Sequence, residues 1–237
     1  MNVVVRPNSS RFLWAIVPVK TLALAKSRLA SVLPPDIRMR LLVTMLEDVL
    51  ELLLGKPAVD RVLVVTADAE IRSLAERNGA SVLREAQITG LNPALRLGVA
   101  QATDQGARQV LLLPADVPLA TPDEIGRITA CGCEKSASVI IPSRDGEGTN
   151  ALFLSPPSAI EPSFGVGSFA RHRRQAAAKG IKLRVMRLWG VGIDIDEAAD
   201  LPFLLRRDSS SRRYGFLNSA LYEAGSVERR PMEASRS

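Results

Sequence analysis

The feature that most constrains the fold is a run of large aliphatic residues at positions 110–113, which is followed by Pro114 and Asp116. Such a continuous run is typical of a strand buried on both faces, as in a parallel sheet. Proline has no N–H to donate, so Pro114 marks the carboxyl end of the strand. Asp116 is therefore expected at the edge where open α/β sheets bind ligands, and its carboxylate suits Mg²⁺. This stretch alone also allows a turn or cap role for Asp116.

Other segments repeat this pattern and alternate with helical ones. The strand-like segments are residues 12–17, 61–66, 81–84, 137–142, 151–154 and 183–188. Helical periodicity or helix-start residues occur at 37–54, at 69–78, at 92–105, from 121 and from 168. Strands and helices in this order predict right-handed βαβ units and a parallel sheet, and hence an α/β fold.

Two of these helices have capping residues at their expected starts. Asn92 precedes Pro93, and Thr121 precedes Pro122 and two acids. Asparagine and threonine are favoured at the N-cap, and proline is favoured at the first helical position. Asn92 and Thr121 are therefore predicted to cap their helices. The carboxamide of Asn92 could at the same time face a nucleotide base.

The composition favours one globular domain. The chain has 237 residues, of which 46% are hydrophobic and 24% are charged. Residues 1–11 are expected to form a flexible lead, and the Arg/Ser-rich segment 206–237 a largely mobile extension. Cys131 and Cys133 are too few for a zinc site and are expected as free thiols. Without a secretory signal or an apolar segment of membrane-spanning length, the chain is expected to be cytoplasmic.

The net charge of +6 raises the question of nucleic-acid binding. Residues 171–187 contain seven Lys and Arg residues and no acid. They contain no aromatic side chains on which bases could stack, which argues against a nucleic-acid partner. A small anionic substrate or a solvated helix face accounts for this segment better.

A basic loop follows the first predicted strand. It contains Lys20, Lys26 and Arg28, but neither a G-x-G-x-x-G pattern nor a Walker A pattern. Loops at this place in nucleotide-binding α/β folds meet phosphates, which lysine binds as a point charge and arginine as a fork. The alternative is a solvated basic loop.

Two further acids lie near the end of the predicted domain, at Asp194 and Asp196. Strand alternation would place both carboxylates on one side and the isoleucines between and before them on the other. Two such carboxylates repel each other unless a cation lies between them. Together with Asp116 they predict a three-carboxylate Mg²⁺ site, while the alternative gives Asp196 a helix-capping role.

Two glycine-containing segments offer anion-binding groups. Thr149 follows Gly148 directly before a strand, and Gly165 and Ser168 lie at the start of a predicted helix. Free N–H groups at a helix start favour phosphate, although a plain hairpin and a plain helix cap would have the same sequence. His172, the single histidine, is expected to be structural rather than catalytic.

Taken together, these motifs resemble the 2-phospho-L-lactate guanylyltransferase family, the CofC-type enzymes of coenzyme F-420 biosynthesis. The resemblance covers about residues 12–205 and rests on the order of the motifs, because no single one is specific. The motifs are Pro18-Val19-Lys20, Lys26-Ser27-Arg28, Gly90-Leu91-Asn92, Pro114-Ala115-Asp116, Gly148-Thr149-Asn150, Phe164-Gly165 with Ser168, and Asp194-Ile195-Asp196.

This resemblance implies a single-domain, Rossmann-like, three-layer nucleotidyltransferase fold with a mostly parallel mixed sheet. The implied metal ligands are Asp116, Asp194 and Asp196. The residues expected near the phosphate and carboxylate of the acceptor are Thr149, Gly165 and Ser168. The nucleotide-binding residues are expected to be Lys20, Lys26, Arg28 and Asn92. Of all these, Lys20, Lys26 and Asp116 are expected to be catalytic.

The implied reaction moves GMP from GTP, with Mg²⁺, to the phosphate of 2-phospho-L-lactate, phosphoenolpyruvate or 3-phospho-D-glycerate. The sequence does not distinguish these acids. Other candidate partners are the next enzyme of the pathway and, as a homodimer, a second copy of the chain. Two alternative functions remain open at this point, a sugar-phosphate or molybdopterin nucleotidyltransferase and a non-catalytic nucleotide- or RNA-binding protein.

Overall fold

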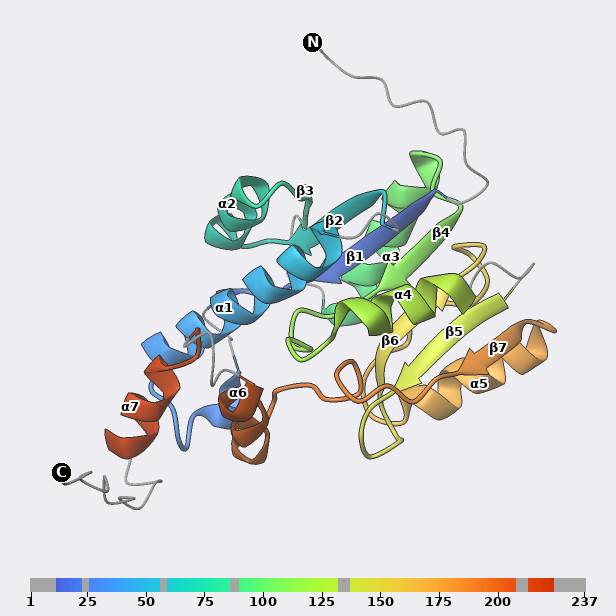
Figure 1. Ribbon diagram of the computed structural model, residues 1–237. Coiled ribbons are helices and arrows are strands. Elements are labelled where there is room, and N and C mark those ends of the chain that lie inside the picture. Colours follow the sequence, from blue (N-terminus) through green and yellow to red (C-terminus); the bar gives the residue numbers. More distant parts are fainter. Residues whose placement is uncertain are drawn as a thin grey trace, which may run out of the picture.

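The computed structural model describes residues 12–22, 26–55, 59–85, 90–131, 137–207 and 213–223. In these ranges seven strands form one sheet in the order β3-β2-β1-β4-β6-β5-β7 (Figure 1). The strands are β1 (Leu13–Pro18), β2 (Arg61–Thr66), β3 (Ser81–Arg84), β4 (Gln109–Leu112), β5 (Ala137–Pro142), β6 (Thr149–Leu154) and β7 (Lys182–Val185). β6 is antiparallel to β4 and β5, and the other neighbouring pairs are parallel. The predicted α/β fold with a mostly parallel mixed sheet is confirmed.

Helices cover both faces of the sheet, which gives three layers (Figure 1). They are α1 (Pro35–Leu54), α2 (Ala69–Arg77), α3 (Leu91–Asp104), α4 (Pro122–Cys131), α5 (Ser168–Ala178), α6 (Leu201–Arg207) and α7 (Phe216–Glu223). Along β1, Ala15 and Val17 belong to the core shared with α1 and α4, whereas Trp14 and Ile16 belong to the core shared with α3 and α5. This alternation is why β1 reads as a continuous apolar run.

α3 lies close over the sheet because residue 98 is a glycine. A Cβ at Gly98 would lie 2.6 Å from Cγ2 of Ile16 and 3.0 Å from Cγ2 of Val65. The helix could not keep this position with a larger residue there. The close approach fixes the N-terminal end of α3 near the carboxyl ends of β1 and β2.

The start of α4 agrees with the prediction from the sequence, and the start of α3 differs from it. Thr121 and Glu124 form reciprocal hydrogen bonds at the start of α4, as in a capping box. Asn92 is not an N-cap, since α3 begins one residue earlier and its N-cap is Gly90. Gly90 has a φ of 108°, a conformation that other residues rarely adopt, so it begins the helix in place of Asn92.

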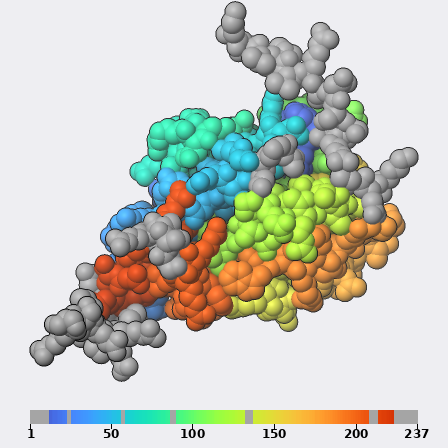
Figure 2. All heavy atoms as spheres, viewed as in Figure 1, coloured from blue at the N-terminus to red at the C-terminus, as the bar shows by residue number. Residues whose placement is uncertain are grey.

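A C-terminal helix not predicted from the sequence packs on α1. In Figures 1 and 2 the red α7 lies beside the blue α1. Leu217, Ala220 and Leu221 are buried in the core shared with α1. The Tyr214 hydroxyl donates a hydrogen bond of 2.6 Å to Asp48. Part of the segment expected to be mobile therefore contributes to the core, while residues 1–11, 208–212 and 224–237 lie outside the described residues.

Leu217→Ala is expected to lower the free energy of unfolding by about 2–5 kcal/mol, as other buried Leu→Ala changes do. Leu217 is fully buried, so the substitution would leave a cavity between α7 and α1. Leu97→Ala is the matched control, because Leu97 is 49% exposed and should cost about 0.5 kcal/mol or less. Urea denaturation measures both values. Equal losses in the two variants would show that α7 does not belong to the stable core.

Within the described ranges, every helix falls short of the length and apolar character that crossing a bilayer requires.

Candidate active site

A cleft of about 710 Å³ opens at the carboxyl ends of β1 and β4, within the usual size range of small-molecule sites. The structure brings most of the expected site residues to its wall: Lys20, Lys26, Arg28, Asp116, Thr149, Gly165, Asp194 and Asp196. Ser168 and Asn92 do not line the cleft and instead hydrogen-bond residues that do. Cations and carboxylates predicted from segments far apart in the sequence therefore meet in one place.

A backbone hydrogen bond places the three aspartates on the same wall. The N–H of Ile195 donates to the carbonyl of Asp116 at 2.9 Å. Asp194 and Asp196 alternate with the buried Ile193 and Ile195, so both carboxylates are directed to the cleft. The segment is irregular and does not belong to a strand, because β7 ends at Val185. The predicted alternation is thus present without the predicted strand.

Lys26 joins two of these carboxylates. Its Nζ lies 3.0 Å from Oδ2 of Asp116 and 2.9 Å from Oδ1 of Asp196, and only 6% of its side chain is exposed. Burial alone would lower the pKa of Lys26, but the charges of Asp116 and Asp196 outweigh it, and the pKa is raised. For Asp196, burial alone would raise the pKa. The positive charges of Lys26 and Arg28 outweigh burial, and the pKa is lowered. The group is therefore a charged ammonium between carboxylates.

The backbone of Lys26 is also unusual. Its φ of 45° lies in the left-handed region. Within the described part of the chain, every other residue with a positive φ is a glycine. A side chain in this region costs energy and is kept where the surrounding structure holds it. Here the two carboxylates hold the lysine at the cleft wall.

Asp194 is a largely buried carboxylate next to a second negative charge. Burial and the negative charge of Asp116 raise its pKa, and Asn150 donates to its Oδ1 at 3.2 Å. A positive ion between Asp194 and Asp116 would relieve this repulsion. Within the described residues, however, no three His, Cys, Asp or Glu side chains are grouped as a metal cage. The three-carboxylate site stays a prediction, because Lys26 lies between two of its members.

Behind the cleft wall, a buried hydrogen-bond chain fixes Thr149. Nδ1 of His172 lies 3.0 Å from the Thr149 hydroxyl, and the Ser168 hydroxyl donates to the same oxygen at 3.1 Å. Nε2 of His172 accepts the N–H of Ser163 at 2.9 Å, so the ring proton is on Nδ1 and points to Thr149. The Thr149 hydroxyl thus accepts two hydrogen bonds from buried side chains.

His172 stays neutral at pH 7. Burial, with a smaller contribution from the charge of Arg171, lowers its pKa to about 4. A neutral imidazole, held by backbone and hydroxyl groups, positions other residues and does not move protons near pH 7. The structural role expected for the single histidine agrees with this geometry.

The low pKa of His172 predicts a loss of stability in mild acid. Between the unfolded pKa of about 6.5 and the folded pKa of about 4, the unfolded chain binds a proton that the folded protein does not. The free energy of unfolding should therefore fall by up to about 3 kcal/mol as the pH is lowered through this window. Chemical denaturation of the wild type and His172→Gln, compared between pH 7 and 5, measures the difference. Parallel curves for the two proteins would contradict it.

Asn92 supports the glycine loop that follows Phe164. Its Nδ2 donates to the Phe164 carbonyl at 3.0 Å, and its Oδ1 accepts the Phe164 N–H at 2.7 Å. Both ends of the carboxamide are used by this backbone, which fixes the position of Gly165 at the cleft. The predicted contact of Asn92 with a nucleotide base stays a prediction.

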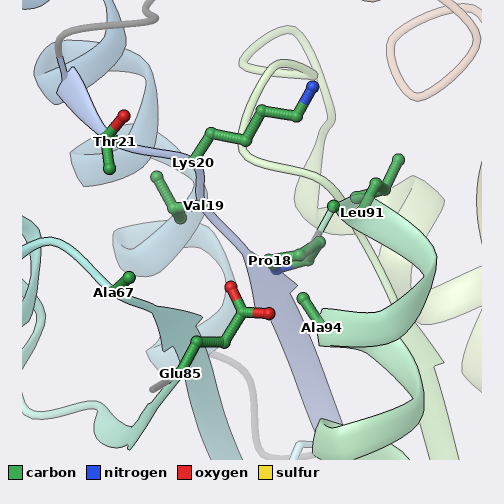
Figure 3. A pocket seen from close by; sticks show the side chains of 9 residues that line it. Pro18, Val19, Lys20, Thr21, Ala67, Glu85, Leu91 and Ala94 are labelled. Carbon is green, nitrogen blue, oxygen red and sulfur yellow. The ribbon is translucent and has the colours of Figure 1, made fainter. Parts of the chain in front are cut away.

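A narrower slot adjoins the cleft beside the start of α3 (Figure 3). The side chain of Glu85, which directly follows β3, points into it. Glu85 is not among the residues predicted from the sequence.

Comparison with known proteins identifies the family. A family model described as guanylyl transferase CofC like matches residues 13–233. The chain belongs to this family. It is 46% identical over 187 residues to a phosphoenolpyruvate guanylyltransferase of Sphaerobacter thermophilus, covering 79% of this chain and 89% of the relative. It is 36% identical over 189 residues to a 3-phospho-D-glycerate guanylyltransferase of Phenylobacterium zucineum, covering 78% and 86%.

Solved structures share the fold. A putative nucleotide-diphospho-sugar transferase from Desulfovibrio desulfuricans superposes with a TM-score of 0.73 at 17% identity, covering 90% of this chain and 98% of its own. A cytidylyltransferase from Leptospira borgpetersenii has a TM-score of 0.56 at 14% identity, covering 91% and 96%. The resemblance stated from the motifs is thus confirmed for the family and for the nucleotidyltransferase fold.

Proposed function

We propose that this protein transfers GMP from GTP to the phosphate of phosphoenolpyruvate or 3-phospho-D-glycerate in the biosynthesis of coenzyme F-420, releasing pyrophosphate. Relatives named for these two reactions are 46% and 36% identical to it. The observation that carries the proposal is the meeting of Lys26, Asp116 and Asp196 in the cleft of a family member. These groups supply the fixed charges that a transfer between two phosphates requires.

In the proposed reaction an oxygen of the acceptor phosphate attacks the α-phosphorus of GTP. A new P–O bond forms while the bond from that phosphorus to the bridging oxygen breaks, and the electron pair leaves with pyrophosphate. The attacking phosphate is already ionised near neutral pH, so no strong base is needed. Repulsion between two anions is the main obstacle, which Lys20, Lys26 and Arg28 reduce by placing positive charge at the cleft.

Asp116, Asp194 and Asp196 are the residues proposed to hold Mg²⁺. All three carboxylates belong to residues that line the same cleft, which supports a cation there. When bound, Mg²⁺ would neutralise phosphate charge and orient the phosphate oxygens. The ammonium of Lys26 lies between Asp116 and Asp196, so a bound ion would share these carboxylates with the lysine.

The acceptor is proposed to lie against Thr149 and the loop at Gly165. Thr149 lines the cleft, and hydrogen bonds with the buried Ser168 and His172 hold its hydroxyl in place. Gly165, with a φ of 110°, lets the backbone approach the ligand without a side chain in the way.

Pyrophosphate release tests this function. The protein is incubated with GTP and Mg²⁺ and with phosphoenolpyruvate, 3-phospho-D-glycerate or 2-phospho-L-lactate in separate reactions, coupled to the next enzyme of the pathway because the products are labile. Release that depends on one of these acids supports the proposal. Release that is equal with and without any acid would indicate hydrolysis of GTP and contradict it.

A further inference from the structure

The cleft is lined by a cation that lies outside the basic loop after β1. Lys20, Lys26 and Arg28 all come from that loop. Arg144 lines the cleft as well, but it belongs to the hairpin loop that joins β5 to β6. This hairpin loop ends where β6 begins at Thr149, the residue proposed to lie against the acceptor. The charge of Arg144 therefore reaches the cleft from the element that carries the proposed acceptor site.

The guanidinium of Arg144 has two contacts that orient it. Its Nη2 lies 3.4 Å from Oδ1 of Asp200, whose side chain is only 10% exposed. Its Cζ lies 5.2 Å from the centre of the Phe203 ring in α6, within the range of a cation–π contact. The side chain of Arg144 is nevertheless 56% exposed, so a ligand in the cleft can reach its other N–H groups.

Asp200 also fixes the backbone of the acidic segment. Its Oδ2 accepts the N–H of Asp196 at 3.1 Å and the N–H of Glu197 at 2.9 Å. One largely buried carboxylate thus joins the cation of the hairpin loop to the segment that carries two of the proposed metal ligands. Arg144 is therefore positioned relative to these ligands by the fold.

The proposed acceptor has two anionic groups, and only its phosphate reacts. The phosphate has to reach the α-phosphorus of GTP, near the ammonium of Lys26 and the proposed Mg²⁺ ligands. The carboxylate of the acceptor then needs a positive partner elsewhere in the cleft. A guanidinium binds a carboxylate through two parallel hydrogen bonds, whereas an ammonium acts as a point charge. Arg144 has the chemistry and the place that this second group requires.

On the basis of the proposed function, we propose that Arg144 binds the carboxylate of the acceptor, with its guanidinium oriented by Asp200 and Phe203. Arg144 would then favour phosphorylated acids over phosphate esters that lack a carboxylate. The competing explanation is that Arg144 pairs with Asp200 and only supports the fold. A purely structural ion pair would leave the choice of acceptor unchanged, and pairs with one partner this exposed contribute little to stability.

Acceptors with and without a carboxylate test the inference. Vinyl phosphate is phosphoenolpyruvate with hydrogen in place of the carboxylate, and glycerol 3-phosphate is 3-phospho-D-glycerate with a hydroxymethyl group there. Arg144→Gln should lower kcat/KM for the acid by about 10-fold to 10²-fold, mostly through KM, because it removes a charge-assisted pair. The value for the counterpart without a carboxylate should change by less than about threefold. Arg144→Lys should recover only part of the loss, since an ammonium lacks the fork.

The KM for GTP distinguishes a lost contact from a disturbed cleft. In Arg144→Gln it should stay within about twofold of the wild type, because the contact is made only with the acceptor. Arg77→Gln, an exposed change on α2, is the matched control and should alter neither KM. An unchanged KM for the acid, or an equal rise in KM for the acid and for GTP, would overturn the inference. If Arg144→Gln does not fold, a wild-type KM for the acid in Arg144→Lys would overturn it.

Binding calorimetry separates this inference from the proposed function. The acid is titrated into protein saturated with Mg²⁺ and α,β-methylene-GTP, an analogue that cannot release pyrophosphate. Acid binding that depends on Arg144, without pyrophosphate release from GTP, would support the carboxylate contact and contradict the reaction. Pyrophosphate release by the wild type, with equal acid binding by the wild type and Arg144→Gln, would support the reaction and contradict the contact.

Discussion

Asp116→Asn should lower kcat by about 10²-fold or more, the size of loss seen when one preorganised electrostatic group is removed from an active site. The substitution keeps the shape of the side chain and removes its charge. Asp116 contacts Lys26 at 3.0 Å and raises the pKa of Asp194. Its charge therefore acts both on a cation and on a second carboxylate of the cleft. Steady-state assays over a range of Mg²⁺ concentrations measure the loss.

The control for this variant is Asp123→Asn, an exposed change in the first turn of α4. It removes the same charge from the same region of the chain and should leave kcat within about twofold, since exposed sites of this kind contribute little. Thermal unfolding of both variants shows whether folding is intact. Near-normal turnover by folded Asp116→Asn would contradict the assignment of Asp116 to the metal and phosphate site.

Lys26→Met should have an effect of similar size, about 10²-fold or more on kcat, because it removes a positive charge that faces the phosphates. The same substitution should also strengthen the binding of Mg²⁺, although it lowers kcat. Without the ammonium, Asp116 and Asp196 lose the cation that now lies 3.0 and 2.9 Å from them. The protein without nucleotide should therefore bind Mg²⁺ more tightly, as titration calorimetry can measure.

Lys179→Met, an exposed change at the end of α5, is the matched control and should alter neither quantity. The two measurements on Lys26→Met separate a charge effect from a general disturbance of the loop. Loss of turnover together with weaker Mg²⁺ binding would show that the lysine supports the loop and does not compete with the ion. Unchanged turnover would remove Lys26 from the catalytic group.

The parts of the site that follow from the sequence are those set by local chemistry. A buried strand followed by Pro114 can place Asp116 at only one edge of a parallel sheet, and this placement is correct. The basic loop with Lys26 comes directly after the central strand β1, so it lies at the same edge of the sheet. Their ion pair was beyond prediction, because it joins residues 90 positions apart through the order of the strands.

The positions that sequence reasoning missed depend on distant partners. Asn92 has the residue type of an N-cap, but Gly90 begins the helix and the carboxamide bonds Phe164, 72 positions away. The helix that contains Leu217 has little periodicity of its own and is stabilised by α1.

The most direct test of the account is a ³¹P NMR spectrum of the protein with GTP, Mg²⁺ and either phosphoenolpyruvate or 3-phospho-D-glycerate. Attack on the α-phosphorus predicts a pair of coupled diphosphate signals, from GMP joined to the acceptor phosphate, that grows together with an equal amount of pyrophosphate. Formation of GDP and orthophosphate, or a spectrum that does not change with either acid, would contradict it.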